Sequence, residues 1–358
     1  MSGIAMITTG GTGGHIFPGL AVAAELISHG WRVFWLGTRD GMEARIVPDH
    51  KLEFEALDFA SVRGKGWLRL LLGPVAILWA CLQARRVIRR RRPNVVLGFG
   101  GFASFPGALM AVAQGVPLVI HNLDARPGLA NRILRHGAEH VLTGFPHTFE
   151  GKRGVTWVGN PLRSDILALP PPEQRFEGRT GALNMLVVGG SLGAAALNER
   201  VPEALALLPP GGRPRVTHQA GAKHIDALTR AYARAGVDAE CVAFIDDMAR
   251  RYASADLVVC RSGATTIAEL AAVGLASILV PFPHAADDHQ VDNARVLSER
   301  GAAELILQSD LTPQRLADWI AQTTRDRLLT MAIAARGLRK ADAARRVAET
   351  CIAVAQMR

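Results

Sequence analysis

A strand followed by a glycine turn and a helix occurs twice in this sequence, and this repeated plan constrains the fold more than any other feature. The first copy runs from the apolar strand Ile4–Thr8 through the glycine turn at residues 10–14. The second runs from Asn184–Val188 through the glycine turn at residues 189–193. Glycine allows the backbone to approach a ligand closely, and the N–H groups at a helix N-terminus bind anions. Each copy therefore indicates a site for an anion at the end of a strand.

Strand and helix patterns alternate along both halves of the chain, which favours parallel sheets with helices on both faces. The predicted strands are residues 4–8, 32–36, 95–98, 118–121, 140–143, 155–158, 184–188, 215–218, 241–244, 257–260, 276–281 and 303–307. The predicted helices are residues 17–29, 74–92, 104–115, 127–136, 194–208 and 340–356. We therefore predict an α/β protein with two Rossmann-like domains, whose parallel sheets face a central cleft. Residues 170–172, three prolines before a charged stretch, are interpreted as a linker.

Length and composition fit two packed domains with anionic partners. The 358 residues suggest about two domains, and the 49% of apolar residues are sufficient for packed cores. The formal net charge of +9 favours phosphates, nucleic acid or an acidic membrane surface as partners. We expect no nucleic acid, because no binding motif is present and only 6% of the residues are aromatic. The four cysteines are scattered, which argues against a metal site. The N-terminus lacks a signal-peptide pattern, and this absence predicts a cytoplasmic protein.

Residues 67–92 join an apolar stretch to a cluster of arginines. The uncharged run that begins at Leu70 has about 13 residues, whereas a membrane-spanning helix needs roughly 20. An apolar face beside basic residues suits a helix that lies on an anionic membrane surface. The alternative is an ordinary core helix with a solvated basic end. We favour the membrane surface.

Residues 257–269 have the richest pattern for ligand binding. A buried strand leads into a Ser-Gly turn and then into a helix that opens with Thr265 and Thr266. The unpaired N–H groups of such a helix start suit a diphosphate. Glu269 lies one turn further on the same face, where its carboxylate could accept hydrogen bonds from both hydroxyls of a ribose. The polar cluster at residues 284–293 could bind a sugar, and a metal site there is disfavoured because adjacent Asp287 and Asp288 diverge on a helix.

Seven motifs together resemble the MurG family, the undecaprenyl-diphospho-muramoylpentapeptide β-N-acetylglucosaminyltransferases of bacterial peptidoglycan synthesis. The motifs occur in the family's order at residues 10–15, 98–102, 158–163, 189–194, 244–248, 261–266 and 281–293. The resemblance implies a two-domain glycosyltransferase fold of the B type and inverting transfer from UDP-N-acetylglucosamine to lipid I, at the cytoplasmic face of the inner membrane. It also implies domains at residues 1–162 and 163–339, with residues 340–358 packing back on the first. We expect no cofactor and no metal ion, and the oligomeric state stays open.

The resemblance also implies a set of site residues. His15 would be the catalytic base, because an imidazole exchanges protons near neutral pH. Glu269 would hold the ribose, and Ile245 would flank the uracil through its backbone. The donor-binding residues implied are Thr12, Gly13, Gly14, Asp124, Arg163, Ser191, Ile245, Ala264, Thr265, Thr266, Ile267, Ala268, Glu269 and Gln290. The acceptor diphosphate would lie on the turns at residues 10–14 and 98–101.

Three positions depart from the family pattern. Asn122 replaces a glutamate and cannot titrate, which shifts the acid–base role to His15. Asp124 replaces a donor-contacting asparagine and adds charge near a diphosphate, and Leu192 replaces a glutamine that offers a polar contact. The changes at Asn122, Leu123 and Asp124 keep open a catalytically inactive membrane-bound scaffold.

Two other enzyme classes share parts of this pattern. A UDP-sugar 2-epimerase would use the same fold and donor without a lipid acceptor, and the apolar and basic segment at residues 67–92 argues against it. An NAD-dependent dehydrogenase is disfavoured because Ile16 stands where the third glycine of GxGxxG belongs.

Overall fold

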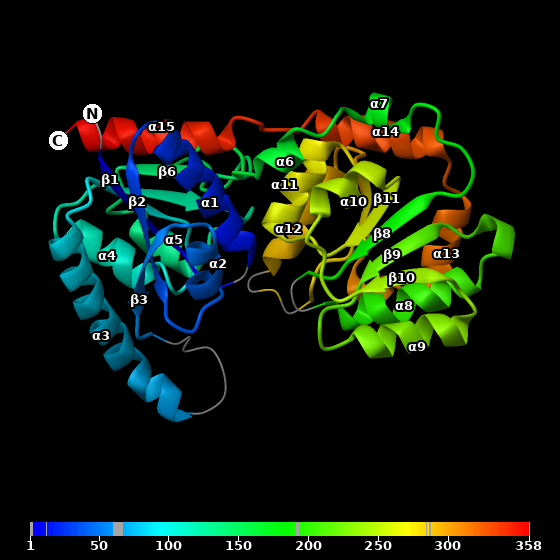
Figure 1. The fold of residues 1–358 in the computed structure, drawn as a ribbon, viewed down its shortest axis with the longest axis horizontal. Coiled ribbons are helices and arrows are strands. Elements are labelled where there is room, and N and C mark those ends of the chain that lie inside the picture. Colours follow the sequence, from blue (N-terminus) through cyan, green and yellow to red (C-terminus); the bar gives the residue numbers. More distant parts are fainter. Residues whose placement is uncertain are drawn as a thin grey trace. The chain divides into compact units, whose positions relative to one another are not determined.

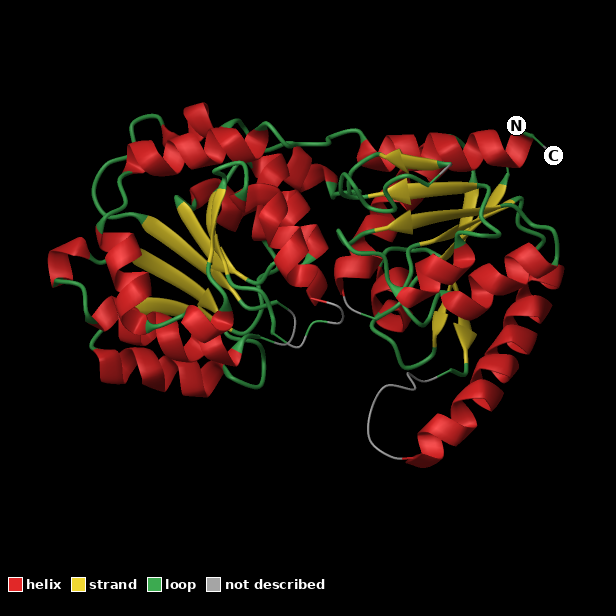
Figure 2. Cartoon of the chain, turned by 180° about the vertical axis from the view of Figure 1, so that it is seen from behind, coloured by secondary structure: helices red, strands yellow, loops and turns green. Residues whose placement is uncertain are grey.

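The computed structural model describes residues 3–11, 13–59, 67–152, 154–190, 193–283, 285 and 288–357, with the backbone alone for residues 67–72. The chain divides into two compact units. Unit 1 comprises Met1–Arg163 and Lys340–Arg358, and unit 2 comprises Ser164–Arg339 (Figure 1). Each unit has a parallel sheet with helices on both of its faces (Figure 2), so the predicted α/β fold with two parallel-sheet domains is confirmed.

Unit 1 is built on a parallel sheet whose seven described strands follow the order β3-β2-β1-β4-β5-β6-β7. The strands are β1 (Ile4–Thr8), β2 (Arg32–Thr38), β3 (Glu53–Leu57), β4 (Val95–Gly98), β5 (Leu118–Asn122), β6 (His140–Thr143) and β7 (Val155–Trp157). Its helices are α1 (Gly13–Ser28), α2 (Glu43–Asp49), α3 (Trp67–Arg91), α4 (Phe105–Ala113), α5 (Leu129–Leu134) and α15 (Ala343–Gln356). Although α15 is the last helix of the chain, it packs on α1, β4 and β5 through a stripe of alanine, valine and cysteine side chains.

The sequence did not predict α2 and β3. Strand β3 lies at the edge of the sheet and carries the alternating charges Glu53 and Glu55, which hide the apolar period of a strand. Both acids form ion pairs with Arg91 near the end of α3, with N–O distances of 2.6 and 2.7 Å. Helix α2 is short and contains Pro48. The charges that hide the strand in the sequence therefore join the edge strand to the helix that covers it.

Helix α3 has 25 residues and projects beyond the sheet of unit 1 (Figure 1). From residue 73 on, small and apolar side chains, among them Ala80, Ala84 and Ile88, face the core, whereas Leu78 and Trp79 are exposed. Among the described helices, none has both the length and the apolar character that crossing a bilayer requires.

Unit 2 repeats the plan with a parallel sheet whose six described strands follow the order β10-β9-β8-β11-β12-β13. The strands are β8 (Asn184–Val188), β9 (Arg215–Gln219), β10 (Ala239–Val242), β11 (Leu257–Cys260), β12 (Ala276–Leu279) and β13 (Ala303–Leu305). The helices are α6 (Ser164–Leu167), α7 (Pro172–Phe176), α8 (Ala195–Ala206), α9 (Ile225–Ala235), α10 (Met248–Ser254), α11 (Ala264–Val273), α12 (His289–Ser298), α13 (Pro313–Ala321) and α14 (Arg325–Arg336), with 3-10 turns η1 (Pro210–Gly212) and η3 (Gln308–Asp310).

The interpretation of residues 170–172 as a linker is wrong. Pro172 begins α7, and Phe176 of the same helix belongs to the core of unit 2. The guanidinium of Arg175 is buried and donates to the carbonyl oxygens of Pro170, Tyr252, Val273 and Gly274. Burial lowers the pKa of Arg175 to about 10, and the carbonyl oxygens offset the desolvation of its charge. The prolines and charges are therefore part of a packed contact.

Both sheets reverse their strand order beside their first strand. In unit 1 the order changes between β1 and β4, and in unit 2 it changes between β8 and β11. At such a point the connections leave toward opposite faces, and ligands bind beyond the carboxyl ends of the two strands. The four glycine turns found in the sequence follow these four strands.

Two buried histidines should make the fold sensitive to acid. Burial lowers the pKa of His218 to about 3, and burial lowers the pKa of His121 to about 4, although a hydrogen bond to Gly159 O raises it in part. Below about pH 6.5 the unfolded chain binds protons that the folded chain does not, so the free energy of unfolding falls by about 1.4 kcal/mol per pH unit for each histidine. We expect His218→Asn to remove one such contribution in urea unfolding between about pH 6.5 and 4.5. The exposed His29→Asn is the control, and equal pH dependence in both variants would contradict this assignment.

Candidate functional site

The two glycine turns of unit 1 lie side by side. Strands β1 and β4 pair in parallel with Thr8 opposite Gly98, and the N–H of Phe99 donates to the carbonyl oxygen of Thr8 at 3.2 Å. Gly101 has a φ of +79°, and a Cβ built on it would lie 3.3 Å from the carbonyl oxygen of Gly10. Only glycine combines this backbone conformation with this close approach. The turns at residues 10–14 and 98–101 are thus brought together by the strands that precede them.

His15 lies in the first turn of α1. The helix begins at Gly13, four residues earlier than predicted, so Gly13, Gly14 and His15 are its first three residues. All three are partly exposed. The first N–H groups of a helix have no partner within the helix and carry partial positive charge. The imidazole of His15 therefore lies among donors that suit an anion, while Thr12 falls outside the described residues.

Arg163 ends the first of the two segments of unit 1, and its side chain packs against the same helix. Its guanidinium carbon lies 5.3 Å from the ring centroid of Phe17, a cation–π distance. The stack holds a permanent positive charge close to the first turn of α1. A diphosphate bound at that turn would be stabilised by this charge.

Asn122 ends β5 and belongs to an amide network beneath the second turn. Its Nδ2 donates to the carbonyl oxygen of Asp124 at 2.6 Å, and its Oδ1 accepts from Nδ2 of Asn131 at 2.9 Å. A Cβ on Gly100 would lie 2.9 Å from the side chain of Asn131, so the network supports the turn from below. The side chain of Asp124 is partly exposed. The amide of Asn122 therefore stabilises the turn that follows β4.

In unit 2, Gln219 holds the glycine turn that follows β8. Its Oε1 accepts from the N–H of Gly189 at 3.1 Å, and its Nε2 donates to the carbonyl oxygens of Gly190 and Ala243 at 2.9 and 3.3 Å. Gln219 is 3% exposed. The turn toward α8 is therefore fixed by a side chain from the neighbouring strand. Ser191 and Leu192 lie outside the described residues.

The turn after β11 is joined to the start of α12. Ser262 Oγ donates to the carbonyl oxygen of Gln290 at 2.7 Å, and Asn293 Nδ2 donates to the carbonyl oxygen of Ser262 at 3.1 Å. The side chain of Gln290 accepts from the N–H of Phe282 at 3.0 Å. The predicted donor residue Gln290 therefore lies beside the Ser-Gly turn. His284 and Asp287 are outside the described residues, and the described residues contain no cluster of three or more His, Cys, Asp or Glu suited to a metal ion.

The predicted donor run from Ala264 to Glu269 forms the start of α11. Ala264 and Ile267 are buried, whereas Thr265, Thr266, Ala268 and Glu269 are partly exposed on one face. Gly263 caps this helix with extended backbone, so the N–H groups of the first turn point out of the helix end. Ile267 could meet a ligand only through its backbone.

Tyr252 holds the carboxylate of Glu269. The phenol of Tyr252, on α10, donates to Oε2 of Glu269 at 3.1 Å, and Tyr252 is 1% exposed. The buried ring fixes the position of the hydroxyl. The carboxylate therefore has a fixed direction on the exposed face of α11.

Ile245 lies just beyond β10, which ends at Val242, two residues before the predicted end. The side chain of Ile245 is buried at 6% exposure, whereas that of the preceding Phe244 is 57% exposed. A ligand could therefore reach Ile245 through its backbone, as the resemblance implies.

Sequence reasoning missed the supporting residues Gln219, Tyr252 and Asn131. Gln219 and Tyr252 bond to segments 30 and 17 residues away, and Asn131 bonds to the end of a strand nine residues earlier, so none of the motifs contains both partners. The one available signal was a polar residue at the buried end of a predicted strand or inside an apolar helix face.

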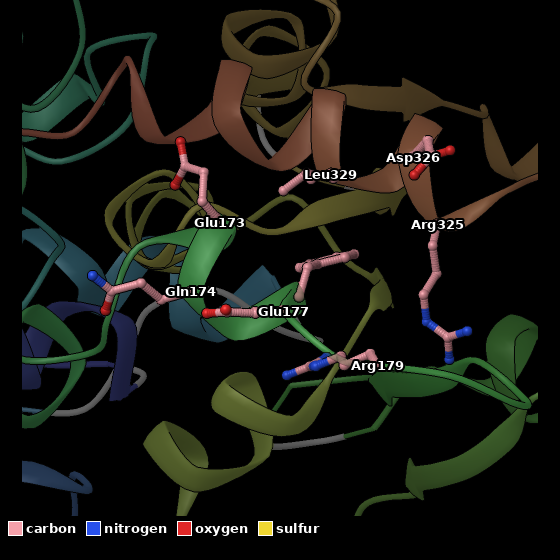
Figure 3. Close-up of a pocket in the computed structure, with 8 residues that line it drawn as sticks. Glu173, Gln174, Glu177, Arg179, Arg325, Asp326 and Leu329 are labelled. Carbon is pink, nitrogen blue, oxygen red and sulfur yellow. The ribbon is translucent and has the colours of Figure 1, made fainter.

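A cavity of about 400 Å³ lies elsewhere in unit 2, between α7 and α14 (Figure 3). Its lining includes Arg179 and Arg325, and both form ion pairs with the buried Asp256 just before β11. Asp256 also accepts from the N–H of Asn184, the first residue of β8, at 2.8 Å. The cavity is therefore at the amino ends of the strands, opposite the glycine turns, and its arginines serve the fold.

Comparisons with known proteins agree with this geometry. The model of the glycosyltransferase family 28 N-terminal domain matches residues 5–143, and the model of the family's C-terminal domain matches residues 184–347. The chain is 57% identical over 346 residues to a protein of Aromatoleum aromaticum named UDP-N-acetylglucosamine--N-acetylmuramyl-(pentapeptide) pyrophosphoryl-undecaprenol N-acetylglucosamine transferase, covering 97% of this chain and 96% of the relative.

Two further relatives support the same assignment. A protein of the same name from Dechloromonas aromatica is 54% identical, covering 99% of this chain and 100% of the relative. A crystal structure of MurG from Acinetobacter baumannii superposes with a TM-score of 0.81 at 36% identity, covering 98% of this chain and 99% of that one. The resemblance inferred from the seven motifs is therefore confirmed.

Proposed function

Because the chain belongs to glycosyltransferase family 28, we propose that it transfers N-acetylglucosamine from UDP-N-acetylglucosamine to the muramoyl 4-hydroxyl of undecaprenyl-diphospho-muramoylpentapeptide. This reaction converts lipid I into lipid II in peptidoglycan synthesis. The observation that carries the proposal is near full-length identity to transferases of that name. Glycine turns at the switch points of both sheets supply the anion sites that two diphosphate substrates require.

Unit 2 binds the donor in this proposal. The first turn of α11 receives the diphosphate through Thr265 and Thr266, and Glu269 accepts from the ribose hydroxyls. The backbone at Ile245 flanks the uracil, and Gln290 contacts the sugar. Ser191 and Thr12, which the resemblance also assigns to donor binding, lie outside the described residues.

Unit 1 binds the acceptor. Its diphosphate lies on the paired turns at residues 10–14 and 98–101, where the positive end of the α1 dipole stabilises it. Asp124 and Arg163, which the resemblance assigns to the donor, belong to the same unit. The assignment of ligand contacts to residues of the two units remains a prediction that substitutions can test.

His15 is the proposed general base. It takes the proton of the acceptor hydroxyl while that oxygen forms a bond to the anomeric carbon, and the bond from that carbon to UDP breaks with its electron pair on the departing oxygen. Attack from the face opposite UDP inverts the configuration. The helix N-termini and Arg163 stabilise the charge that UDP gains.

A transfer assay with labelled UDP-N-acetylglucosamine and a short-chain lipid I analogue tests the proposal. We expect a labelled lipid II analogue with inverted configuration. His15→Ala should lower kcat by about 10²- to 10⁴-fold, the usual contribution of a general base, while the donor KM changes little. The exposed His29→Ala is the matched control.

Three outcomes would contradict parts of this proposal. Donor turnover without acceptor would identify an epimerase, and no turnover under any condition would identify an inactive scaffold. Near-normal turnover by His15→Ala would remove His15 as the base and leave the transfer intact.

The contact between Tyr252 and Glu269 gives a prediction for the donor. Tyr252→Phe removes one hydroxyl and preserves the buried ring, so the Glu269 carboxylate loses its fixed direction. Hydrogen bonds to charged groups contribute about 1.5–3 kcal/mol, and we therefore expect UDP to bind about 10- to 100-fold more weakly in calorimetry. Binding of 2′,3′-dideoxy-UDP should not change, because it lacks both ribose hydroxyls.

The matched control for this prediction is Tyr232→Phe, which removes the other tyrosine hydroxyl of the chain. Tyr232 is buried in the same unit and bonds to His218 at 2.9 Å. Equal losses for UDP and its dideoxy analogue, or equal effects of both variants, would show that Tyr252 does not act through the ribose contact.

Helix α3 supplies the proposed membrane contact. Its exposed apolar residues Val75, Leu78, Trp79 and Leu82 are followed by the exposed Arg85, Arg86 and Arg89, and we call these seven residues the α3 surface. Arg90 and Arg91 form ion pairs with β3, whereas Arg85 and Arg89 form none with the described residues. Apolar side chains beside basic groups suit the interface of an anionic membrane.

Vesicles of phosphatidylglycerol test this contact. Each basic residue near an anionic surface contributes about 1 kcal/mol, so the double variant Arg85→Gln and Arg89→Gln should bind about thirtyfold more weakly. Binding should also weaken as salt is added. The control is Arg230→Gln and Arg234→Gln, which removes two exposed arginines at the same spacing from α9. No binding at low salt, or equal losses in both variants, would contradict the proposal.

A further inference from the structure

A buried carboxylate, that of Glu43, lies beneath the glycine turn that leads into α1. Glu43 is the first residue of α2 and is 0% exposed. Its Oε1 accepts from the N–H of Thr38 at 2.9 Å and from Thr38 Oγ1 at 2.7 Å, and its Oε2 accepts from the N–H of Gly11 at 3.4 Å. The carboxylate thus joins the end of β2 to the turn at residues 10–14.

Three glycines from three segments make room for this carboxylate. A Cβ on Gly37 would lie 2.6 Å from Cγ of Glu43, and a Cβ on Gly10 or Gly41 would meet its carboxylate oxygens still more closely. A Cβ on Gly10 would also lie 2.7 Å from Cβ of Ala103. Gly10 is therefore required for the close approach of the carboxylate to the turn, as well as for any ligand above it.

The charge of Glu43 is costly to bury and forms no ion pair with the described residues. Its hydrogen bonds come from backbone N–H groups and one hydroxyl. An uncharged side chain of similar size would fill the space without the desolvation cost of a carboxylate. A carboxylate offers two acceptor oxygens. Here Oε1 accepts from Thr38 at the end of β2, and Oε2 accepts from Gly11 in the turn after β1.

The N–H of Gly11 donates to the buried carboxylate of Glu43, so it is not available to a ligand on the exposed side of the turn. The first turn of α1, which includes His15, begins two residues after Gly11 and carries the positive end of the helix dipole. We infer that Glu43 is a positioning residue of the transferase: it fixes the turn at residues 10–14 so that α1 presents its first N–H groups to the acceptor diphosphate and holds His15 at the acceptor hydroxyl. This inference rests on the proposed function and adds a residue to its acceptor site.

Glu43→Gln tests the inference with almost no change in volume. The amide keeps one acceptor oxygen and places an NH₂ group against either Thr38 N–H or Gly11 N–H, so one of these donors loses its acceptor. We expect kcat/KM for the lipid I analogue to fall about 10- to 100-fold, the range of a lost hydrogen bond to a charged group. The Kd of UDP should stay within about twofold, because the contacts proposed for its uracil, ribose and diphosphate, at Ile245, Glu269 and the first turn of α11, all lie in unit 2.

Gly41→Ala provides a second route to the same effect without changing the carboxylate. Gly41 does not have a positive φ, but its Cβ would collide with the carboxylate of Glu43 and displace it. It should therefore reproduce the loss in acceptor kcat/KM. The control is Gly128→Ala in the same unit, where a Cβ would meet nothing within 4 Å.

Val141→Ala controls for stability alone. Val141 is buried in β6, which is four strands away from β2 in the sheet, so this variant destabilises unit 1 without contacting the turn. If it lowers acceptor kcat/KM as much as Glu43→Gln at a similar loss of Tm, Glu43 has only a structural role and the inference is overturned. An unchanged acceptor kcat/KM in Glu43→Gln also overturns it. Absence of transfer in the unmodified protein would instead refute the proposed function.

Discussion

The positions of all the glycine turns depend on one interaction in each unit, the parallel pairing of its first strand with the strand beyond the reversal of strand order. These pairs are β1 with β4 and β8 with β11. In unit 1 it sets Thr8 beside Gly98, and in unit 2 it sets Val188 beside Cys260. Because the strands run in parallel, both turns of a unit emerge at the same sheet edge and both following helices start there. Two helix N-termini and two glycine turns are thereby placed at one position, a concentration of N–H donors that no single loop could supply.

Side chains from neighbouring elements hold these turns in shape. Gln219 bonds both sides of the turn after β8, Asn131 supports the turn after β4, and Glu43 reaches the turn after β1. A glycine turn has high conformational entropy, and a buried polar group that is fully bonded restricts it strongly. The anion sites are therefore preorganised by polar groups that a ligand need not touch.

The sequence predicted what is local and missed what is long-range. The glycine turns, most strands and the start of α11 each carry their signal within about ten residues, and the motifs around them sufficed to recognise the family. Strand β3 was missed because its alternating charges pair with Arg90 and Arg91 of α3, 35 or more residues away. The prolines at 170–172 suggested a linker because the carbonyl oxygens that bury Arg175 lie up to 99 residues further on. Tyr252 and Glu43 were missed for the same reason, since each acts on a segment outside its own motif.

The environment of position 122 bears on which group can move a proton in unit 1. The amide of Asn122 donates to Asp124 O and accepts from Asn131, and a carboxylate there could only accept. Asparagine thus supplies a hydrogen-bond donor that a glutamate carboxylate could not supply, so the departure from the family pattern fits its surroundings. His121, the preceding residue, has its pKa lowered to about 4 by burial and is 0% exposed, which keeps it neutral and out of reach of a substrate. His15 is partly exposed at the helix start that faces the paired turns, and the acid–base chemistry proposed for this unit therefore falls to it.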